Sequence, residues 1–444
     1  MHEAVTKMDT GKQGEEGVKA DSVRMTLLAL FFFSFPLPVA WQQTVLFLLL
    51  VLLGVHCWHE RRWPPTLLDR PLFLLFGTFL LSSLFSPAVG NSLLGYRKLW
   101  LVGAFFITAT LIQKPKEIER LVSLLAIMAS VVAAYGIVQH YTGIDLNKQL
   151  RGKPPSLDPF WFGRDEGFRI KGFHPSGITF AHSLLFPLTF VTVWLSCVGL
   201  SIRQRLLLAV GWGLMAFALL FSLTRGVWLA YLVVLFLLGV IRGGKTLVGV
   251  TGGAIVLGVF LMTAGAGVQE RLQSTFNLVQ NLPRSQIWQA NIEMIKERPV
   301  LGWGYGNYRQ FRAPFYERHP QANHTGHAHN TFLQIGVDGG LIGLAAFLFF
   351  FWSLLRMGWE TYQRIPLADE PFRSMMLGAL LSIVGFLVGG LTQHNFGDAE
   401  VVIVMWAIAG LMVRARGWAA ENEEVRVEDS TRGKTTYTSS TLHS

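Results

Sequence analysis

The sequence predicts an all-α polytopic membrane protein with about 12 transmembrane helices and a large, partly helical periplasmic loop. Of the 444 residues, 51% are hydrophobic and only 15% are charged, whereas a soluble domain carries about 25% charged residues. Apolar runs long enough to cross about 30 Å of hydrocarbon recur along the chain. The two Cys residues, Cys57 and Cys197, lie inside such runs, so neither a disulfide framework nor a Cys metal site is expected.

Twelve apolar segments qualify as candidate spans. The first two are short and meet near Pro36, Pro38 and Trp41, so a single re-entrant hairpin is the alternative there. The twelve are roughly 25–40, 42–58, 71–87, 98–113, 119–141, 177–201, 204–222, 226–241, 246–265, 336–355, 374–392 and 399–413.

The distribution of Lys and Arg predicts the orientation. Alternate loops hold nearly all of them, and the short loops on the other side hold only Arg97, Lys98 and Arg225. Cytoplasmic loops of membrane proteins are enriched in Lys and Arg. Both termini are therefore expected in the cytoplasm, and the two long loops outside. The net charge of +10 then marks cytoplasmic loops and lipid contacts, and no nucleic-acid partner is expected.

These patterns divide the chain into five parts. Residues 1–24 form a cytoplasmic N-terminal tail whose mixed charge is unlike a cleavable signal peptide, so the first span should remain as an anchor. Residues 25–265 hold the first nine spans, with an outer loop at 142–176. Residues 266–335 form the large outer loop, where any catalytic chemistry would face the periplasm or the cell exterior, and 336–413 hold the last three spans. Residues 414–444 are expected to be a disordered cytoplasmic tail, because the end is rich in Glu, Ser and Thr.

Ionisable residues gather at the outer face rather than within the spans, a pattern that favours an enzyme over a transporter. Arg169, Lys171 and His174 precede the sixth span in GRDEGFRIKGFHPSG, where cations suit phosphate oxygens; a solvated charged loop is the alternative. Arg225 begins the eighth span, where its guanidinium fork matches a diphosphate. The alternative for Arg225 is snorkelling to lipid head groups.

The second outer loop is the most informative segment. Arg284 is expected just before an amphipathic helix in RSQIWQANIEMIKERP. Gly304 lies in the turn LGWGYGNYRQF, which either lets a substrate approach the backbone or is a structural turn. Four histidines follow in ERHPQANHTGHAHN, namely His319, His324, His327 and His329. A histidine suits a general base. A metal site is less expected, because no Cys, Asp or Glu completes a set.

These residues resemble the O-antigen ligase and O-antigen polymerase superfamily over roughly 170–410. The ligase motif is His, then Asn, Ser or Gln, nine residues, Gly, two residues, and Gly, Thr or Tyr. Here it is formed by His329, Asn330, Gly340 and Gly343. The family's Arg at the outer end of a span resembles Arg225. Its large-loop Arg before a Trp-bearing helix resembles Arg284.

The resemblance implies a glycosyltransferase of the bacterial inner membrane. It implies transfer of a glycan from undecaprenyl diphosphate to a lipid A-core sugar hydroxyl with inversion, without metal or other cofactor. His329 would be the general base, and Arg225 and Arg284 would hold the diphosphate. Expected substrate-binding residues are Asn330, Arg169, Lys171, His174, His327 and Gly304.

Other functions remain as alternatives at this stage. The same superfamily includes O-antigen polymerases and protein O-oligosaccharyltransferases. A solute transporter is a less favoured alternative from a different class, and an inactive scaffold is the least favoured. The donor sugar, the acceptor and the oligomeric state do not follow from the sequence.

Overall fold

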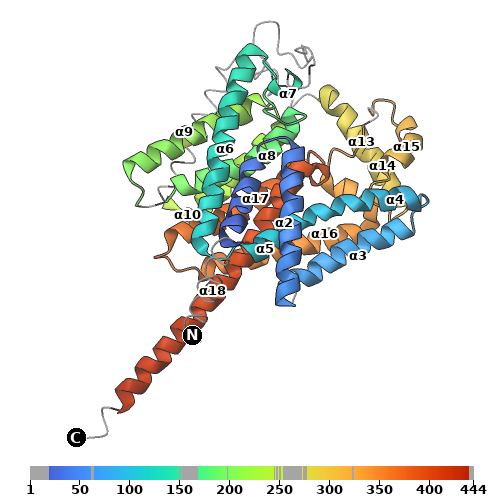
Figure 1. Cartoon of the computed structure of the whole chain (residues 1–444). Coiled ribbons are helices and arrows are strands. Elements are labelled where there is room, and N and C mark those ends of the chain that lie inside the picture. The colour runs from blue at the N-terminus through green and yellow to red at the C-terminus, as the bar shows by residue number, and fades with distance from the viewer. Residues whose placement is uncertain are drawn as a thin grey trace, which may run out of the picture.

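A computed structural model describes residues 20–61, 65–149, 152, 169–197, 199–244, 246, 249, 252–253, 273, 278–322 and 325–439. Within these residues the secondary structure is helical, and the expected all-α polytopic membrane fold is confirmed (Figure 1). By length and composition, eight described helices could cross a membrane. They are α2 (Val39–Glu60), α6 (Pro115–Thr142), α8 (Gly177–Leu195), α9 (Ile202–Phe221), α10 (Arg225–Arg242), α16 (Thr331–Arg364), α17 (Glu370–Gly390) and α18 (Ala399–Ser439).

Four of the twelve expected spans have no counterpart among these eight. The described part of the first is a helix over residues 20–34. The third is α3 (Asp69–Leu84), whose 16 residues extend about 24 Å, less than the hydrocarbon thickness. The fourth is divided into the 3-10 helix η1 (Arg97–Val102) and α5 (Gly103–Leu111). The ninth, at 246–265, lies almost entirely outside the described residues.

A tight turn joins the first helix to α2. Gln42 holds it, because its side-chain amide donates to the carbonyls of Phe35 at 2.9 Å and Leu37 at 3.0 Å. The two segments are therefore separate helices joined by this turn. Phe31, Phe32 and Phe35, at the end of the first helix, pack on one another in the buried core.

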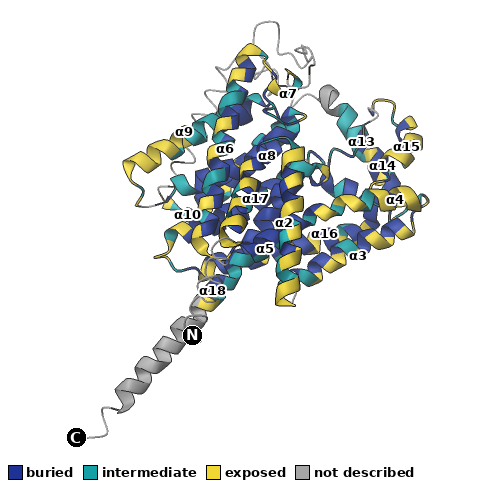
Figure 2. Ribbon diagram, viewed as in Figure 1, coloured by how far each residue is buried: buried dark blue, intermediate teal, exposed yellow. Residues whose placement is uncertain are grey.

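Three helices form the centre of the bundle. The apolar windows of α8, α17 and α18 are 83%, 78% and 78% buried, whereas those of α2 and α9 are 28% and 22% buried. Figure 2 shows the same division, with exposed residues along the outer helices. The central helices pack on one another and on α5 and α10. Apolar side chains exposed on the outer helices, such as Trp58 and Leu206, fit a lipid environment.

The large outer loop has its own small core. The helices α13 (Leu278–Glu297), α14 (Tyr308–Phe311) and α15 (Ala313–Glu317) enclose a cluster around Ile287, Met294 and Trp303. Arg284 lies inside α13, not just before a helix as expected, because α13 starts six residues earlier and includes Pro283. The loop therefore presents Arg284 from a regular helix.

The loop is fastened to α16 at a break in that helix. Gly340 has φ 64° and ψ −166°, so its backbone is not helical. Around the break, Leu341 N donates to Pro299 O at 2.7 Å and Trp303 N donates to Val337 O at 2.8 Å. A Cβ on Gly340 would collide with the carbonyl of Val300. This glycine of the sequence motif thus serves the attachment of the loop.

Helix α18 extends into the segment for which a disordered cytoplasmic tail is expected, and that expectation stays a prediction. Helix α18 continues through Glu421 to Ser439. A helix that is already nucleated in the bundle extends at low cost through residues such as Ala, Glu and Arg. Composition alone does not include this continuation from a span.

Candidate functional site

Two loops on one side of the bundle bring the candidate residues together. One is the segment 325–330 that leads into α16. The other is 391–398 between α17 and α18, which contains the short helix η2 (Asn395–Gly397). Thr331 joins them, because its hydroxyl donates to the carbonyl of Gln393 at 3.1 Å and to the side chain of Asn395 at 2.9 Å.

His329 is held in an unusual backbone conformation. Its φ is 49°, in the left-handed region that non-glycine residues seldom occupy. The next residue, Asn330, is the N-cap of α16: its side-chain oxygen accepts from Leu333 N at 3.1 Å, and its amide donates to Leu391 O at 3.0 Å. Strained conformations of this kind often occur at functional sites. Asn330 thereby fixes the start of the helix next to His329, and its polar atoms are used in that role.

The ring of His329 is oriented by Gln393. Nδ1 of His329 lies 2.9 Å from Oε1 of Gln393. An amide oxygen only accepts, so Nδ1 carries the proton and Nε2 holds the lone pair. Nε2 makes no hydrogen bond with the described part of the chain. This is the arrangement that a general base requires.

The surroundings keep His329 neutral. Burial lowers its pKa, the hydrogen bond to Gln393 raises it, and the positive charge of Arg284 lowers it. A histidine with a pKa below its ordinary value is an unprotonated base at neutral pH.

Arg225 lies beside the same loop. It is the first residue of α10, and the next residue, Gly226, is so close to Thr392 that a Cβ there would collide with the threonine hydroxyl. Thr392 precedes Gln393. The start of α10 therefore meets the loop that orients His329, and its helix N-terminus adds a further preference for anions.

Arg169 and Lys171 are engaged with other parts of the fold. Arg169 Nε donates to Ser222 O at 2.5 Å, and its Nη2 donates to Thr224 Oγ1 at 3.1 Å, which braces the turn before Arg225. Lys171 forms an ion pair with Asp145 at 2.7 Å. Arg169 is thus placed to support Arg225, whereas the charge of Lys171 is balanced by a carboxylate.

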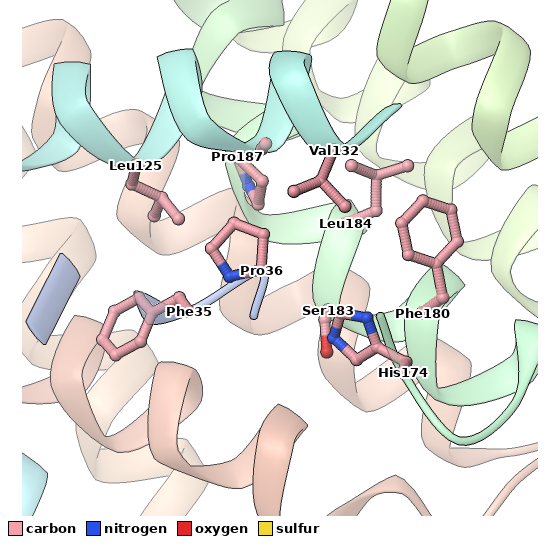
Figure 3. A pocket seen from close by; sticks show the side chains of 10 residues that line it. Phe35, Pro36, Leu125, Val132, His174, Phe180, Ser183, Leu184 and Pro187 are labelled. Atoms are coloured by element: carbon pink, nitrogen blue, oxygen red, sulfur yellow. The ribbon is translucent and has the colours of Figure 1, made fainter. Parts of the chain in front are cut away.

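His174 points into the bundle instead. It lines a small apolar pocket between α6 and α8, together with Ser183, Pro36 and Pro187 (Figure 3). Burial lowers the pKa of His174 to about 4, and neither ring nitrogen has a hydrogen-bond partner among the described residues. The pocket volume of about 10 Å³ is at the lower limit for one water molecule. This environment suits packing rather than contact with a glycan.

Gly304 is also explained by packing. It has φ 99°, and a Cβ there would lie 2.5 Å from the side chain of Ser86. Ser86 donates to Trp303 O at 2.6 Å and Asn307 donates to Ser86 at 2.8 Å. The glycine turn is thereby fixed to the segment after α3, as in the structural alternative from the sequence.

The other histidines of the tract separate into two groups. The ring of His327 lies 4.4 Å from that of His329, and burial, then the charges of His329 and Arg309, lower its pKa to about 4. His319 instead contacts Glu293 at 2.9 Å on α13. His324 lies outside the described residues. Across the described ranges, no three His, Cys, Asp or Glu side chains are arranged to hold a metal ion.

The sequence analysis missed the contribution of the 391–398 loop. Besides Gln393, this loop carries His394, whose pKa burial lowers to about 3, and Asp398, whose pKa burial raises to about 7. Asp398 accepts a hydrogen bond from Thr179 at 3.4 Å. The one available signal was the polar run TQHN between two apolar spans.

Two comparisons with known proteins bear on this arrangement. Residues 210–348 match a family model described as O-antigen ligase. An O-antigen ligase of Salmonella typhimurium is 27% identical over 218 residues, which cover 45% of this chain and 50% of that protein. The resemblance to the O-antigen ligase superfamily is confirmed. The chain spans about half the length of this curated relative.

The family match covers the three candidate catalytic residues. Arg225, Arg284 and His329 all lie within 210–348. Gln393 and His394 lie beyond it, so the contacts of Gln393 with His329 and of His394 with His327 come from the structure alone.

Proposed function

We propose that this chain is a membrane glycosyltransferase of the O-antigen ligase type. It transfers a glycan from undecaprenyl diphosphate to a sugar hydroxyl of lipid A-core at the periplasmic face of the bacterial inner membrane. Both termini lie in the cytoplasm in this proposal, as the Lys and Arg distribution indicates. O-antigen polymerase and protein O-oligosaccharyltransferase are the alternatives within the superfamily.

The observation that carries the proposal is the 2.9 Å contact between Nδ1 of His329 and Oε1 of Gln393. It leaves Nε2 as the acceptor for a proton. In the proposed reaction, Nε2 takes the proton of the acceptor hydroxyl while its oxygen bonds to the sugar carbon that bears the diphosphate. The bond from that carbon to the diphosphate oxygen breaks, and undecaprenyl diphosphate leaves. Attack opposite the leaving group inverts the carbon.

Arg225 and Arg284 have the complementary role. The diphosphate gains negative charge as it leaves, so fixed guanidinium groups stabilise the transition state more than the ground state. The position of Arg225 at the start of α10 and the effect of the Arg284 charge on His329 support this assignment. In this mechanism the cations of the chain itself neutralise the leaving group.

The deciding experiment is a deletion of the gene in its host, with rescue by wild type, His329→Ala or His319→Ala. Lipopolysaccharide and carrier-linked glycan are compared in the same cells. We expect loss of the polymer ladder and accumulation of carrier-linked glycan, rescued by His319→Ala but not by His329→Ala. General-base catalysis supplies about 10²- to 10⁴-fold, so His329→Ala should be nearly inactive at normal membrane levels.

Other results would redirect the proposal. A ladder that collapses to one added repeat would indicate a polymerase. Unchanged lipopolysaccharide with accumulation of carrier-linked glycan would move the acceptor to protein or another envelope polymer. Normal activity of purified His329→Ala would remove the base assignment.

A further inference from the structure

Two exposed cations, Lys98 and Arg309, lie on segments that contact each other near the candidate site. Lys98 is in η1, directly after α4 (Val89–Tyr96), and Arg309 is in α14. These segments meet closely: Asn91 donates to Gln310 at 2.9 Å, and a Cβ on Gly95 would lie 2.8 Å from Tyr305 O. Figure 1 shows α4 and α14 together at the right of the bundle and α10 at its left.

Arg309 is directed to the loop that carries the histidines. Its guanidinium covers the backbone one residue before His327, because a Cβ on Gly326 would lie 2.6 Å from Nη2 of Arg309. After burial and His329, the charge of Arg309 is the third cause that lowers the pKa of His327. Arg309 therefore lies next to the histidine pair.

Lys98 approaches the same site from η1. This helix packs against α18, whose first residue follows the 391–398 loop. Burial and His327 lower the pKa of His394 most, and the charge of Lys98 follows as the third cause. The packing of η1 against α18 and the close approach of Arg309 to Gly326 thus place the two cations near the cluster of His327, His329 and His394.

No structural role accounts for these charges. Lys171 and Arg318 are paired with Asp145 and Glu293, but within the described ranges neither Lys98 nor Arg309 forms an ion pair. Lys98 also belongs to the few cations in short outer loops, where positive charge opposes the expected orientation. Arg225 is another of these few.

We propose that Lys98 and Arg309 bind a phosphate group of the acceptor next to the cluster of His327, His329 and His394, while Arg225 and Arg284 bind the donor diphosphate. This inference rests on the proposed function and extends it from the donor to the acceptor. Guanidinium and ammonium groups both bind phosphate oxygens with charge-assisted hydrogen bonds. The acceptor hydroxyl would then reach Nε2 of His329 while Arg225 and Arg284 hold the leaving group.

The test measures donor and acceptor KM separately with the purified full chain in nanodiscs. The donor is undecaprenyl-diphosphate-linked glycan, and the acceptor is lipid A-core from the deletion strain, used before and after alkaline phosphatase treatment. The variants are Lys98→Gln with Arg309→Gln, the charge-retaining Lys98→Arg with Arg309→Lys, and Lys296→Gln. Lys296 is an exposed control on α13, twelve residues or about 18 Å along the helix from Arg284.

We expect the double Gln variant to raise the acceptor KM about tenfold or more, with donor KM unchanged. The acceptor KM of the charge-retaining variant should stay within a few-fold of the wild-type value. The acceptor KM of Lys296→Gln should equal the wild-type value. Phosphatase treatment should raise the acceptor KM of wild type but not of the double Gln variant.

Three results would overturn the inference. They are an unchanged acceptor KM in the double Gln variant, a rise in donor KM alone, and equal use of treated and untreated acceptor by wild type. If the double Gln variant does not accumulate, the comparison of treated and untreated acceptor with the wild-type enzyme still tests the inference. In all three cases transfer that depends on His329 would leave the proposed function standing, whereas absence of transfer by wild type would reject that function itself.

Discussion

Nδ1 of His329 and Oε1 of Gln393 lie 2.9 Å apart, although the two residues are 64 positions apart in the chain. The contact joins the loop before α16 to the loop after α17. It determines which ring nitrogen holds the lone pair, and it relates the 391–398 loop to the proposed chemistry.

Replacement of Gln393 by Leu should lower kcat about tenfold or more. The ring of His329 would lose the acceptor that fixes its tautomer, so part of the 10²- to 10⁴-fold contribution of a general base would be lost. Gln393→Glu keeps an acceptor at the same place and should retain more activity. Its negative charge should also raise the pKa of His329. Equal kcat in wild type and Gln393→Leu, measured at equal membrane levels, would show that the ring is oriented by other contacts.

The pH profile of kcat/KM should have its acidic limb below pH 6.5. Burial lowers the pKa of His329 from that ordinary value, so the neutral base persists at pH values where a free histidine is half protonated. Activity should fall only when the pH drops through the lowered pKa. An acidic limb near pH 7 would contradict the assignment of the limb to His329. If that limb were absent in Asp398→Asn, it would belong to Asp398, whose pKa is about 7.

Gly340→Ala should reduce the amount of folded protein, whereas Gly343→Ala should not. An Ala at 340 must adopt φ 64° and collide with Val300 O, and such strain costs about 1–3 kcal/mol or more. A Cβ at Gly343 would make an ordinary 3.6 Å contact with Phe79. Thermal stability in detergent checks both variants. Equal midpoints would mean that the break in α16 tolerates a side chain.

The parts of the fold that follow from composition were predictable from the sequence. Hydropathy indicated the eight described helices that could cross a membrane, because lipid demands long apolar segments. Hydropathy predicted full spans where the structure has the shorter helices α3 and α5, because the apolar run alone does not determine where a helix ends. The extension of α18 beyond Glu421 has no hydropathy signal, because those residues are not apolar enough to belong to a span.

The site shows a similar limit. The motif and the resemblance suggested His329, Arg225 and Arg284 as candidates, since these residues are of the types that the proposed chemistry needs. Gln393 has no such signal, because a glutamine in a short loop is not by itself a catalytic residue type. Conversely, His174 follows two cations and Gly304 lies in a glycine-rich turn, and both patterns predicted substrate binding. In the structure, packing accounts for both residues.

Arg225→Lys should remain impaired by at least about tenfold, although it keeps the charge. A guanidinium makes two parallel hydrogen bonds to a diphosphate, whereas an ammonium acts as a single point charge. One lost charge-assisted bond corresponds to about 1.5–3 kcal/mol, and 1.36 kcal/mol is tenfold in rate. Arg318→Lys is the matched control, because Arg318 pairs with Glu293 on the loop surface at 2.9 Å and should keep full activity. Transfer rates of the two purified variants decide the point, and full activity of Arg225→Lys would mean that only the charge at α10 matters.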